Sequence, residues 1–309
     1  MKALYVSVTY RAFLLFDQND VVERKLFDDG VIGYRSGHGR KPIMSVWCYR
    51  IGETLIDTGT IKEEDKLLEC IRADGPVKRV YVTHHHEDHS GNMTGLIRAF
   101  NPEVVISRYA EPLVRRGFRQ YLYQKVIWGR FRPFKPDIVL DLPARGYLNW
   151  ETPDGDFEIH HCPGHSHDMT VLWDPVRRAL FSADLYLGRQ IRFMRRDEIW
   201  SESKKSLQRI TDQLPVRHLY CGHHPVTEKG RAALQAKLSW MQEFETHIMN
   251  KTAKAPYGQL NQEVWDVRLF TLGDGSEKNI RRSVQGRFKI REDIARQVGY
   301  NQAACNFEE

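Results

Sequence analysis

One internal stretch, Thr83–Asn92 with the sequence THHHEDHSGN, constrains the fold more than any other part of the chain. The apolar run Val80–Val82 leads into this stretch and is typical of a short buried strand. A helical pattern of apolar residues follows it, from Met93 to Phe100. The stretch is therefore predicted to be a turn that joins a buried strand to a helix, which is a unit of layered α/β folds.

The side chains of this turn suit divalent metal ions, because imidazole and carboxylate groups are ligands that zinc, manganese and iron accept. His84 and His86 point to the same side of an extended segment, since side chains alternate with period two, and His85 points away. One turn later, Asp88 and His89 can face a second metal. A purification tag is the alternative explanation, but a tag lies at a terminus and contains no ordered aspartate. The turn is therefore predicted to supply two half-sites.

The pattern T-H-x-H-x-D-H in this turn resembles the signature of the metallo-β-lactamase superfamily of hydrolases. The resemblance implies an α/β fold, a four-layer αββα sandwich. It also implies a third histidine on the first metal, His165, and a bridging carboxylate, Asp184. His223 resembles the last histidine, on the second metal, and Asp57 resembles the aspartate that steadies the ligand turn. The implied metal ligands are His84, His86, Asp88, His89, His165, Asp184 and His223.

Two metals bridged by Asp184 and a water would lower the pKa of that water toward neutrality, and the resulting hydroxide would be the nucleophile. Zn²⁺ is the expected ion, and Fe or Mn would also accept these ligands. Asp88 is expected both to bind metal and to orient the hydroxide. Tyr186 could donate a hydrogen bond to a developing oxyanion, with packing in the core as the alternative. No G-x-S-x-G motif is present, so hydrolysis without a covalent intermediate is predicted.

The substrate is expected to be an anionic or acylated small molecule with an ester, thioester or lactone bond. Residues 108–135 carry eight bases and one acid, Glu111, which gives the segment a charge of +7 in a chain of net charge +6. Aromatic residues alternate with these bases. The segment could form a cationic, aromatic wall for an anionic substrate or a nucleic acid, or it could be a solvated helix face with packed aromatics. A nuclease or phosphodiesterase, and a metal-holding regulatory protein with little turnover, are therefore alternatives.

The length of 309 residues allows one large domain and a smaller appendage. We predict a catalytic domain over 1–228, with 108–135 as an insertion or cap, and a helical extension over 229–309. The extension could line the pocket, form a homodimer or contact a partner. Strands are predicted at 3–8, 12–16, 44–50, 54–57, 104–106, 157–161, 170–174, 179–182 and 218–221, and short C-terminal helices near 264–270, 277–284 and 291–298.

Three local features complete these expectations. The Gly/Arg/His-rich residues Arg35–Lys41 suggest a loop, and Thr60 with Glu63 suggests a capping box before a helix. Ser201 or Ser203 is expected to cap a later helix.

The composition bears on where the protein resides. No segment approaches the roughly 18 continuous apolar residues of a membrane helix. The amino terminus lacks the small-residue cleavage site of a signal peptide, which makes a secreted β-lactamase a less expected activity. The five scattered cysteines form no close pair, so reduced thiols and a cytoplasmic location are predicted.

Overall fold

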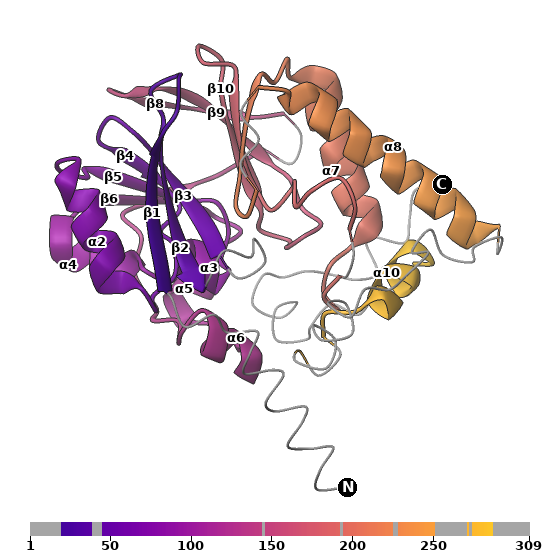
Figure 1. The fold of residues 1–309 in the computed structure, drawn as a ribbon, viewed down its shortest axis with the longest axis horizontal. Coiled ribbons are helices and arrows are strands. Elements are labelled where there is room, and N and C mark those ends of the chain that lie inside the picture. The colour runs from indigo at the N-terminus through magenta and orange to yellow at the C-terminus, as the bar shows by residue number, and fades with distance from the viewer. Residues whose placement is uncertain are drawn as a thin grey trace, which may run out of the picture.

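The computed structural model describes residues 20–38, 45–143, 146–191, 194–224, 228–250, 271 and 274–286. Two β-sheets face each other, and helices cover the outer face of each sheet (Figure 1). This arrangement confirms the predicted four-layer αββα sandwich. Among the described residues, no helix is long and apolar enough to cross a membrane.

The first sheet has seven strands in sequence order: β1 (Asp20–Leu26), β2 (Ile32–His38), β3 (Ser45–Ile51), β4 (Thr54–Ile56), β5 (Arg79–Val82), β6 (Glu103–Ser107) and β7 (Ile138–Leu140). Strands β1 to β4 pair antiparallel, and β4 to β7 pair parallel. Helices α2 (Glu64–Ala73) and α4 (Met93–Phe100) pack their apolar sides on the outer face. Because β4 and β5 run parallel, the residues that follow them meet at one edge of the sheet.

The second sheet has five strands in the order β12-β11-β10-β9-β8. Their bounds are β8 (Leu148–Thr152), β9 (Gly155–His161), β10 (Thr170–Asp174), β11 (Ala179–Ala183) and β12 (His218–Cys221). Strands β9 and β11 are both antiparallel to β10, and β12 is parallel to β11. The carboxyl ends of β9, β11 and β12 therefore lie at the same edge.

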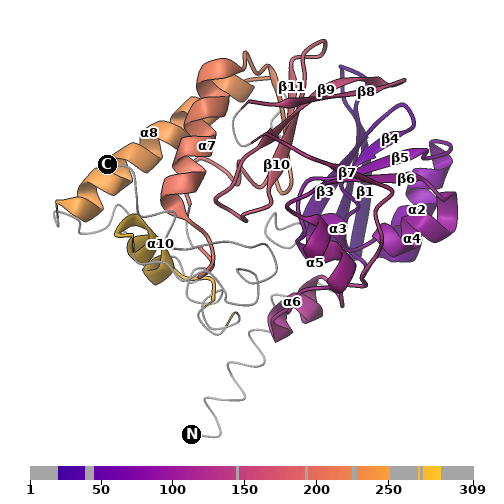
Figure 2. The same ribbon diagram turned by 180° about the vertical axis from the view of Figure 1, so that it is seen from behind.

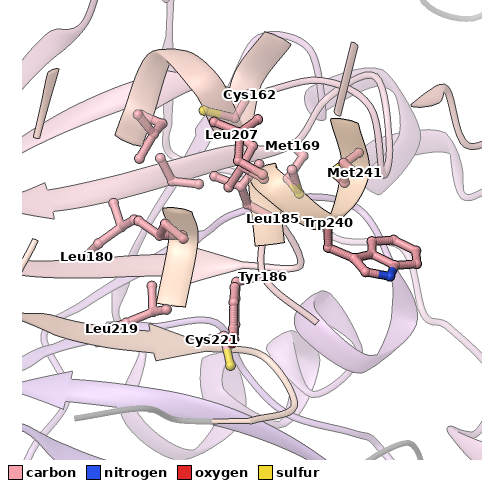
Figure 3. Packing of buried hydrophobic residues seen from close by; sticks show 14 of the residues in the cluster. Cys162, Met169, Leu180, Leu185, Tyr186, Leu207, Leu219, Cys221, Trp240 and Met241 are labelled. Atoms are coloured by element: carbon pink, nitrogen blue, oxygen red, sulfur yellow. The ribbon is translucent and has the colours of Figure 1, made fainter. Parts of the chain in front are cut away.

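Helices α7 (Trp200–Gln213) and α8 (Gly230–Met249) lie side by side over the second sheet (Figures 1 and 2). Their apolar side chains share one cluster with the sheet, including Leu207 from α7 and Met241 from α8 (Figure 3). Helix α10 (Glu277–Val284) adds Ile280 to that cluster and matches a predicted C-terminal helix. The division into domains at residue 228 stays a prediction, and α8 packs directly on the predicted catalytic domain.

The two sheets are held together by an aromatic core and by backbone hydrogen bonds. The rings of Tyr49 and Phe181 both pack against Tyr220, each with its centroid 5.1 Å from that of Tyr220. The Thr170 amide donates to the Thr83 carbonyl oxygen at 3.0 Å, which ties the turn after β5 to the second sheet. The edges that carry the candidate ligands are thereby fixed against each other.

Three local predictions are wrong. Strand β2 extends to His38, because residues 33–37 pair with both β1 and β3, and residues 39–44 are not described. Helix α2 begins after Glu63 without a capping hydrogen bond, since the Glu63 carboxylate accepts from the Thr60 side chain instead of a backbone amide. Neither serine caps α7, which begins at Trp200, because the Ser283 hydroxyl of α10 accepts the hydrogen bond from the Trp200 amide.

Residues 108–135 form two short helices, α5 (Glu111–Arg116) and α6 (Leu122–Ile127), at the same end as the ligand turn (Figure 2). Phe131 and Phe134 are buried in the outer cluster of the first sheet, whereas the eight bases are exposed. The strands predicted at 3–8 and 12–16, and the helices predicted near 264–270 and 291–298, lie outside the described residues.

Candidate metal centre

A first group of convergent side chains joins the two sheets. The turn after β5 supplies His84 and His86, the loop after β9 supplies His165, and the end of β11 supplies Asp184. The Nδ1 atom of His86 lies 2.9 Å from Nε2 of His84 and 3.0 Å from Nε2 of His165. One potential ligand atom from each of the four residues lies within 4.8 Å of the others, so one ion could contact all of them.

A second group lies beside the first and consists of Asp88, His89 and His223. Asp88 and His89 belong to the short helix α3 (Glu87–Ser90), and His223 follows β12. The Oδ2 atom of Asp88 is 3.5 Å from Nε2 of His223. These three residues also offer ligand atoms within 4.8 Å of one another.

Asp184 lies between the two groups. Its Oδ2 atom is 3.1 Å from Nε2 of His165, and its Oδ1 atom is 3.2 Å from Nε2 of His89. Nε2 of His223 is 3.6 Å from Oδ2 of the same carboxylate. All seven residues expected from the sequence to bind metal are therefore brought together at one place.

The chemistry of these groups fits divalent cations. Nε2 of His89 and Oδ1 of Asp184 are buried and, apart from their 3.2 Å approach to each other, have no hydrogen-bond partner among the described residues. Burial lowers the pKa of His165 and His223, but the Asp184 carboxylate outweighs it and raises these pKa values to about 9 and about 10. The pocket thus favours positive charge, and imidazole with carboxylate is a donor set for zinc, iron or manganese.

Asp57 holds the turn Thr83–Asn92 in place through its side-chain carboxylate. It follows β4 with a backbone φ of 62°, a left-handed conformation that is uncommon for a residue other than glycine. Its Oδ1 atom accepts from the Thr83 amide at 2.8 Å, and its Oδ2 atom lies 2.9 Å from the Thr83 hydroxyl and 2.7 Å from Nδ1 of His89. The contact with His89 fixes the ring so that Nε2 faces Asp184.

Other outer ring nitrogens also meet hydrogen-bonding groups. Nδ1 of His223 donates to the Ser45 carbonyl oxygen at 2.6 Å, which fixes the ring with its Nε2 atom toward the centre. Nδ1 of His165 faces Oε2 of Glu198 at 3.5 Å, and Nδ1 of His84 lies 3.1 Å from the Thr83 hydroxyl. His86 differs, because its Nε2 lies 3.1 Å from Nη1 of Arg195.

His85 points away from both groups, as period two predicts. Its amide donates to Asp168 at 2.7 Å, and its Nδ1 lies 2.8 Å from the same buried carboxylate. Burial would raise the pKa of Asp168, but His85 holds it well below its usual range. His85 and Asp168 therefore form a structural pair beside the metal groups.

Gly222 allows the last ligand loop to approach the centre. A Cβ atom at this position would lie 2.5 Å from Oδ1 of Asp184 and 2.7 Å from Cε1 of His89. Any other residue would clash with one of these two side chains.

Tyr186 lies in the hydrophobic cluster outside the second sheet, close to Cys221 (Figure 3). Its side chain is 7% exposed, and its ring centroid is 5.6 Å from Nζ of Lys237. This position agrees with the packing alternative. The catalytic role of Tyr186, like the orienting role of Asp88, stays a prediction.

The segment 108–135 borders the candidate centre through aromatic side chains. The Phe118 ring stacks edge-on against His85 at 4.7 Å between centroids, and the Trp128 ring lies 6.2 Å from His223. The Tyr123 hydroxyl donates to Asp274 at 2.6 Å, which connects α6 to the C-terminal part of the chain. The segment therefore lies beside the candidate centre and also forms part of the outer core.

Sequence reasoning missed several contacts. No motif in the sequence indicates that the guanidinium of Arg195 contacts His86. Glu198 faces the candidate ligand His165, and Asp168 holds His85 beside the candidate centre, yet neither residue belongs to any motif that the sequence displays. The one available signal for Asp168 was its closeness to His165 along the chain, and Asp274 offered none.

The fold and the two His/Asp groups define a metal-dependent hydrolase domain. The model of the metallo-beta-lactamase superfamily matches residues 44–234, and the chain belongs to that superfamily. An uncharacterized protein of Aquifex aeolicus (strain VF5) is 29% identical over 186 residues, which cover 57% of this chain and 81% of that protein.

Solved structures share the fold. A metallo-beta-lactamase from Pontibacter korlensis has a TM-score of 0.56 and 20% identity, with 72% of this chain and 99% of that chain covered. A mutant flavo di-iron protein from Thermotoga maritima has a TM-score of 0.52 and 14% identity, with 75% of this chain and 69% of that chain covered. At identities this low, the structural similarity supports the arrangement of the layers and carries no information about the substrate.

Proposed function

We propose that this chain is a dinuclear hydrolase for an ester, thioester or lactone bond in an anionic or acylated small molecule. His84, His86 and His165 would hold the first ion, and Asp88, His89 and His223 would hold the second. The observation that carries the proposal is the place of Asp184, within 3.2 Å of a histidine from each group. One carboxylate so placed suits a bridge between two cations.

Two bound divalent cations would supply a hydroxide at neutral pH and polarise the carbonyl oxygen of the substrate. Zn²⁺ is our first expectation for the ions, with Fe or Mn as alternatives. Burial raises the pKa of Asp88, but His89 and His223 lower it to about 2, so this carboxylate is ionised at neutral pH. Asp88 can then accept a hydrogen bond from the attacking water and orient it.

The surroundings of the centre support an anionic or acylated substrate. Phe118 and Trp128 provide flat apolar faces beside the two histidines that they contact. The bases of residues 108–135 are exposed. An acyl chain could pack on the rings while the bases attract the charged part of the molecule.

A hydrolysis screen tests the proposal. Protein loaded with zinc, iron or manganese would be offered thioesters, lactones, simple esters, phosphodiesters and RNA, with chelator-treated protein as the control. We expect turnover of a carboxylic ester, thioester or lactone that is lost after chelation and in the Asp88→Asn variant. A protein that holds two metals and turns over nothing in the screen would instead support the regulatory alternative.

A nuclease or phosphodiesterase is the second candidate, and one observation favours it. Arg116, Lys125, Arg130 and Lys135 are exposed and have no ion-pair partner within the part of the chain that is described. A chain of phosphates could engage several of them at once. In that case the logarithm of the binding constant would fall linearly and steeply with the logarithm of salt concentration.

A further inference from the structure

Each of the five candidate ligand histidines directs one ring nitrogen at the candidate centre and the other, its outer nitrogen, away from it. The five rings differ in the group that this outer nitrogen faces. The outer nitrogens of His89 and His223 meet oxygen atoms of Asp57 and Ser45 that accept hydrogen bonds, and the outer nitrogen of His165 lies 3.5 Å from a carboxylate oxygen of Glu198. His84 faces a hydroxyl group, which can also accept. Among these five rings, His86 is the one whose outer nitrogen faces a cation, the guanidinium of Arg195.

Contacts of both the backbone and the side chain hold Arg195 in place. Its amide donates to Oε1 of Glu198 at 2.9 Å, and the neighbouring Met194 pairs with Ser276 in an isolated β-bridge. Its Nε atom lies 3.5 Å from Asp197 and 3.9 Å from Asp274. The side chain is 16% exposed, and Nε has no hydrogen-bond partner among the described residues.

This placement has a chemical consequence for a bound ion. An acceptor at the outer nitrogen lets a ring shed positive charge and makes it a stronger metal ligand. Arginine has five N–H donors and no acceptor, so it cannot play that part. A ring that gives its Nδ1 lone pair to a metal carries hydrogen on Nε2, and that hydrogen would meet another donor here. The guanidinium charge also repels a cation held on the far side of the ring.

We propose that Arg195 weakens the bond between His86 and the first metal, and thereby sets the affinity of that ion and its strength as a Lewis acid. Arg195 acts through His86, so it is a positioning residue and not a catalytic one. The inference rests on the proposed function for the identity of the metal ligands. It also gives the C-terminal part of the chain a role at the centre, because Asp274 helps to hold the guanidinium.

Zinc binding without substrate tests this inference. The His223→Ala variant isolates the first group, and Arg195→Met would be compared in that background by competition with a chromophoric chelator. We expect the dissociation constant of the remaining zinc to fall about tenfold, the reverse of the loss that follows removal of an outer-shell acceptor. A purely structural role for Arg195 predicts the opposite sign, a rise in the dissociation constant.

Two further variants serve as controls for this result. Arg195→Lys keeps a positive charge for Asp197 and Asp274 but removes the planar guanidinium from His86. We therefore expect zinc to bind more tightly than in the parent, by a smaller factor than in Arg195→Met. This variant still tests the inference if Arg195→Met folds poorly. Arg196→Met changes the exposed neighbour and should leave zinc affinity unaltered. Unchanged or weaker zinc binding in both Arg195 variants would overturn the inference alone. Failure of the parent protein to bind zinc at all would overturn the proposed function as well.

Discussion

The two sheets contribute to the candidate centre in different ways. The first sheet supplies His84, His86, Asp88 and His89 from a single turn. The second sheet supplies His165, Asp184 and His223 from three separate strand ends. One side of the centre is a continuous local structure, whereas the other side exists only because β9, β11 and β12 share an edge.

This difference indicates how each side responds to damage. Asp57 supports the whole first turn, with hydrogen bonds to Thr83 and to His89. On the second side each ligand depends on a different neighbour, such as Glu198 for His165 and Ser45 for His223. A change on the second side should therefore affect one ligand at a time, except at Asp184, which lies between both groups.

The largest expected effect comes from Asp184→Ala. Loss of this carboxylate should empty both groups, because it would remove a ligand from each. His223→Ala should lower the metal content by about one equivalent and leave the first group occupied. Elemental analysis of protein purified without chelator, which should approach two equivalents in the parent, distinguishes the outcomes. Equal losses in the two variants would remove the distinction between Asp184 and the other residues of the second side.

Asp57→Asn should have the next largest effect. The amide cannot accept from Thr83 and His89 in the same way, so the ring of His89 would lose its fixed orientation. Outer-shell changes of this kind cost about 10- to 100-fold in metal affinity. We expect the loss chiefly in the second group, measured by zinc competition. A loss confined to the first group would contradict the assignment of His89.

The same comparison explains what the sequence could reveal. The directions in which His84, His85 and His86 point follow from period two within one turn, so local reasoning was sufficient for them. Asp184 and His223 lie far from that turn, and they were found because their motifs occur in the order that the superfamily resemblance implies. The layers of the fold were predicted for the same reason, because the superfamily resemblance implies them.

Contacts between distant segments could not be predicted in this way. Nothing near Asp274 indicates that it lies beside Arg195, because the contact depends on how the C-terminal segment packs. The missing cap of α7 has the same origin, since the acceptor for the Trp200 amide comes from Ser283 of another helix. Local patterns identify which groups need a partner, and tertiary packing decides which partner they receive.

His85→Ala should separate stability from metal binding on the first side. Metal content should be nearly unchanged, since His85 points away from both groups. The free energy of unfolding should fall by about 1–3 kcal/mol, because the buried Asp168 carboxylate loses its partner. Chemical denaturation and elemental analysis of the same preparation would show both results. Emptying of a site by His85→Ala, but not by His84→Ala, would mean that the register of the turn is wrong.

Acidification provides a related test of the same pair. The pKa of Asp168 is depressed in the folded protein, so its contribution to stability is complete above its ordinary pKa of 3.8 and is lost as the pH falls below that value. The His85→Ala variant should show a weaker loss of stability in this acid range than the parent. Denaturation midpoints measured from pH 5 downward would reveal the difference.

The smallest expected effect concerns residues 108–135, which border the centre without supplying a candidate ligand. Arg115, Arg116 and Arg119 are exposed, and Arg115 already pairs with Glu111 at 2.5 Å. Their combined replacement by Ala should raise KM for an anionic substrate a few-fold and leave kcat nearly unchanged, because such charges bind the ground state and the transition state alike.

Salt and a matched variant decide whether these arginines matter. Their effect should shrink at 1 M salt, where exposed charges are screened beyond ~3 Å. Lys66, Arg72 and Arg98 are also exposed, on α2 and α4, which cover the outer face of the first sheet, and their triple replacement by Ala should leave KM unchanged. Equal kinetics in the two triple variants would mean that the basic face of residues 108–135 is solvated surface. In that case, any influence of this segment on substrate choice would come from its aromatic side chains, since the Trp128 ring lies beside His223 and the Phe118 ring packs against His85.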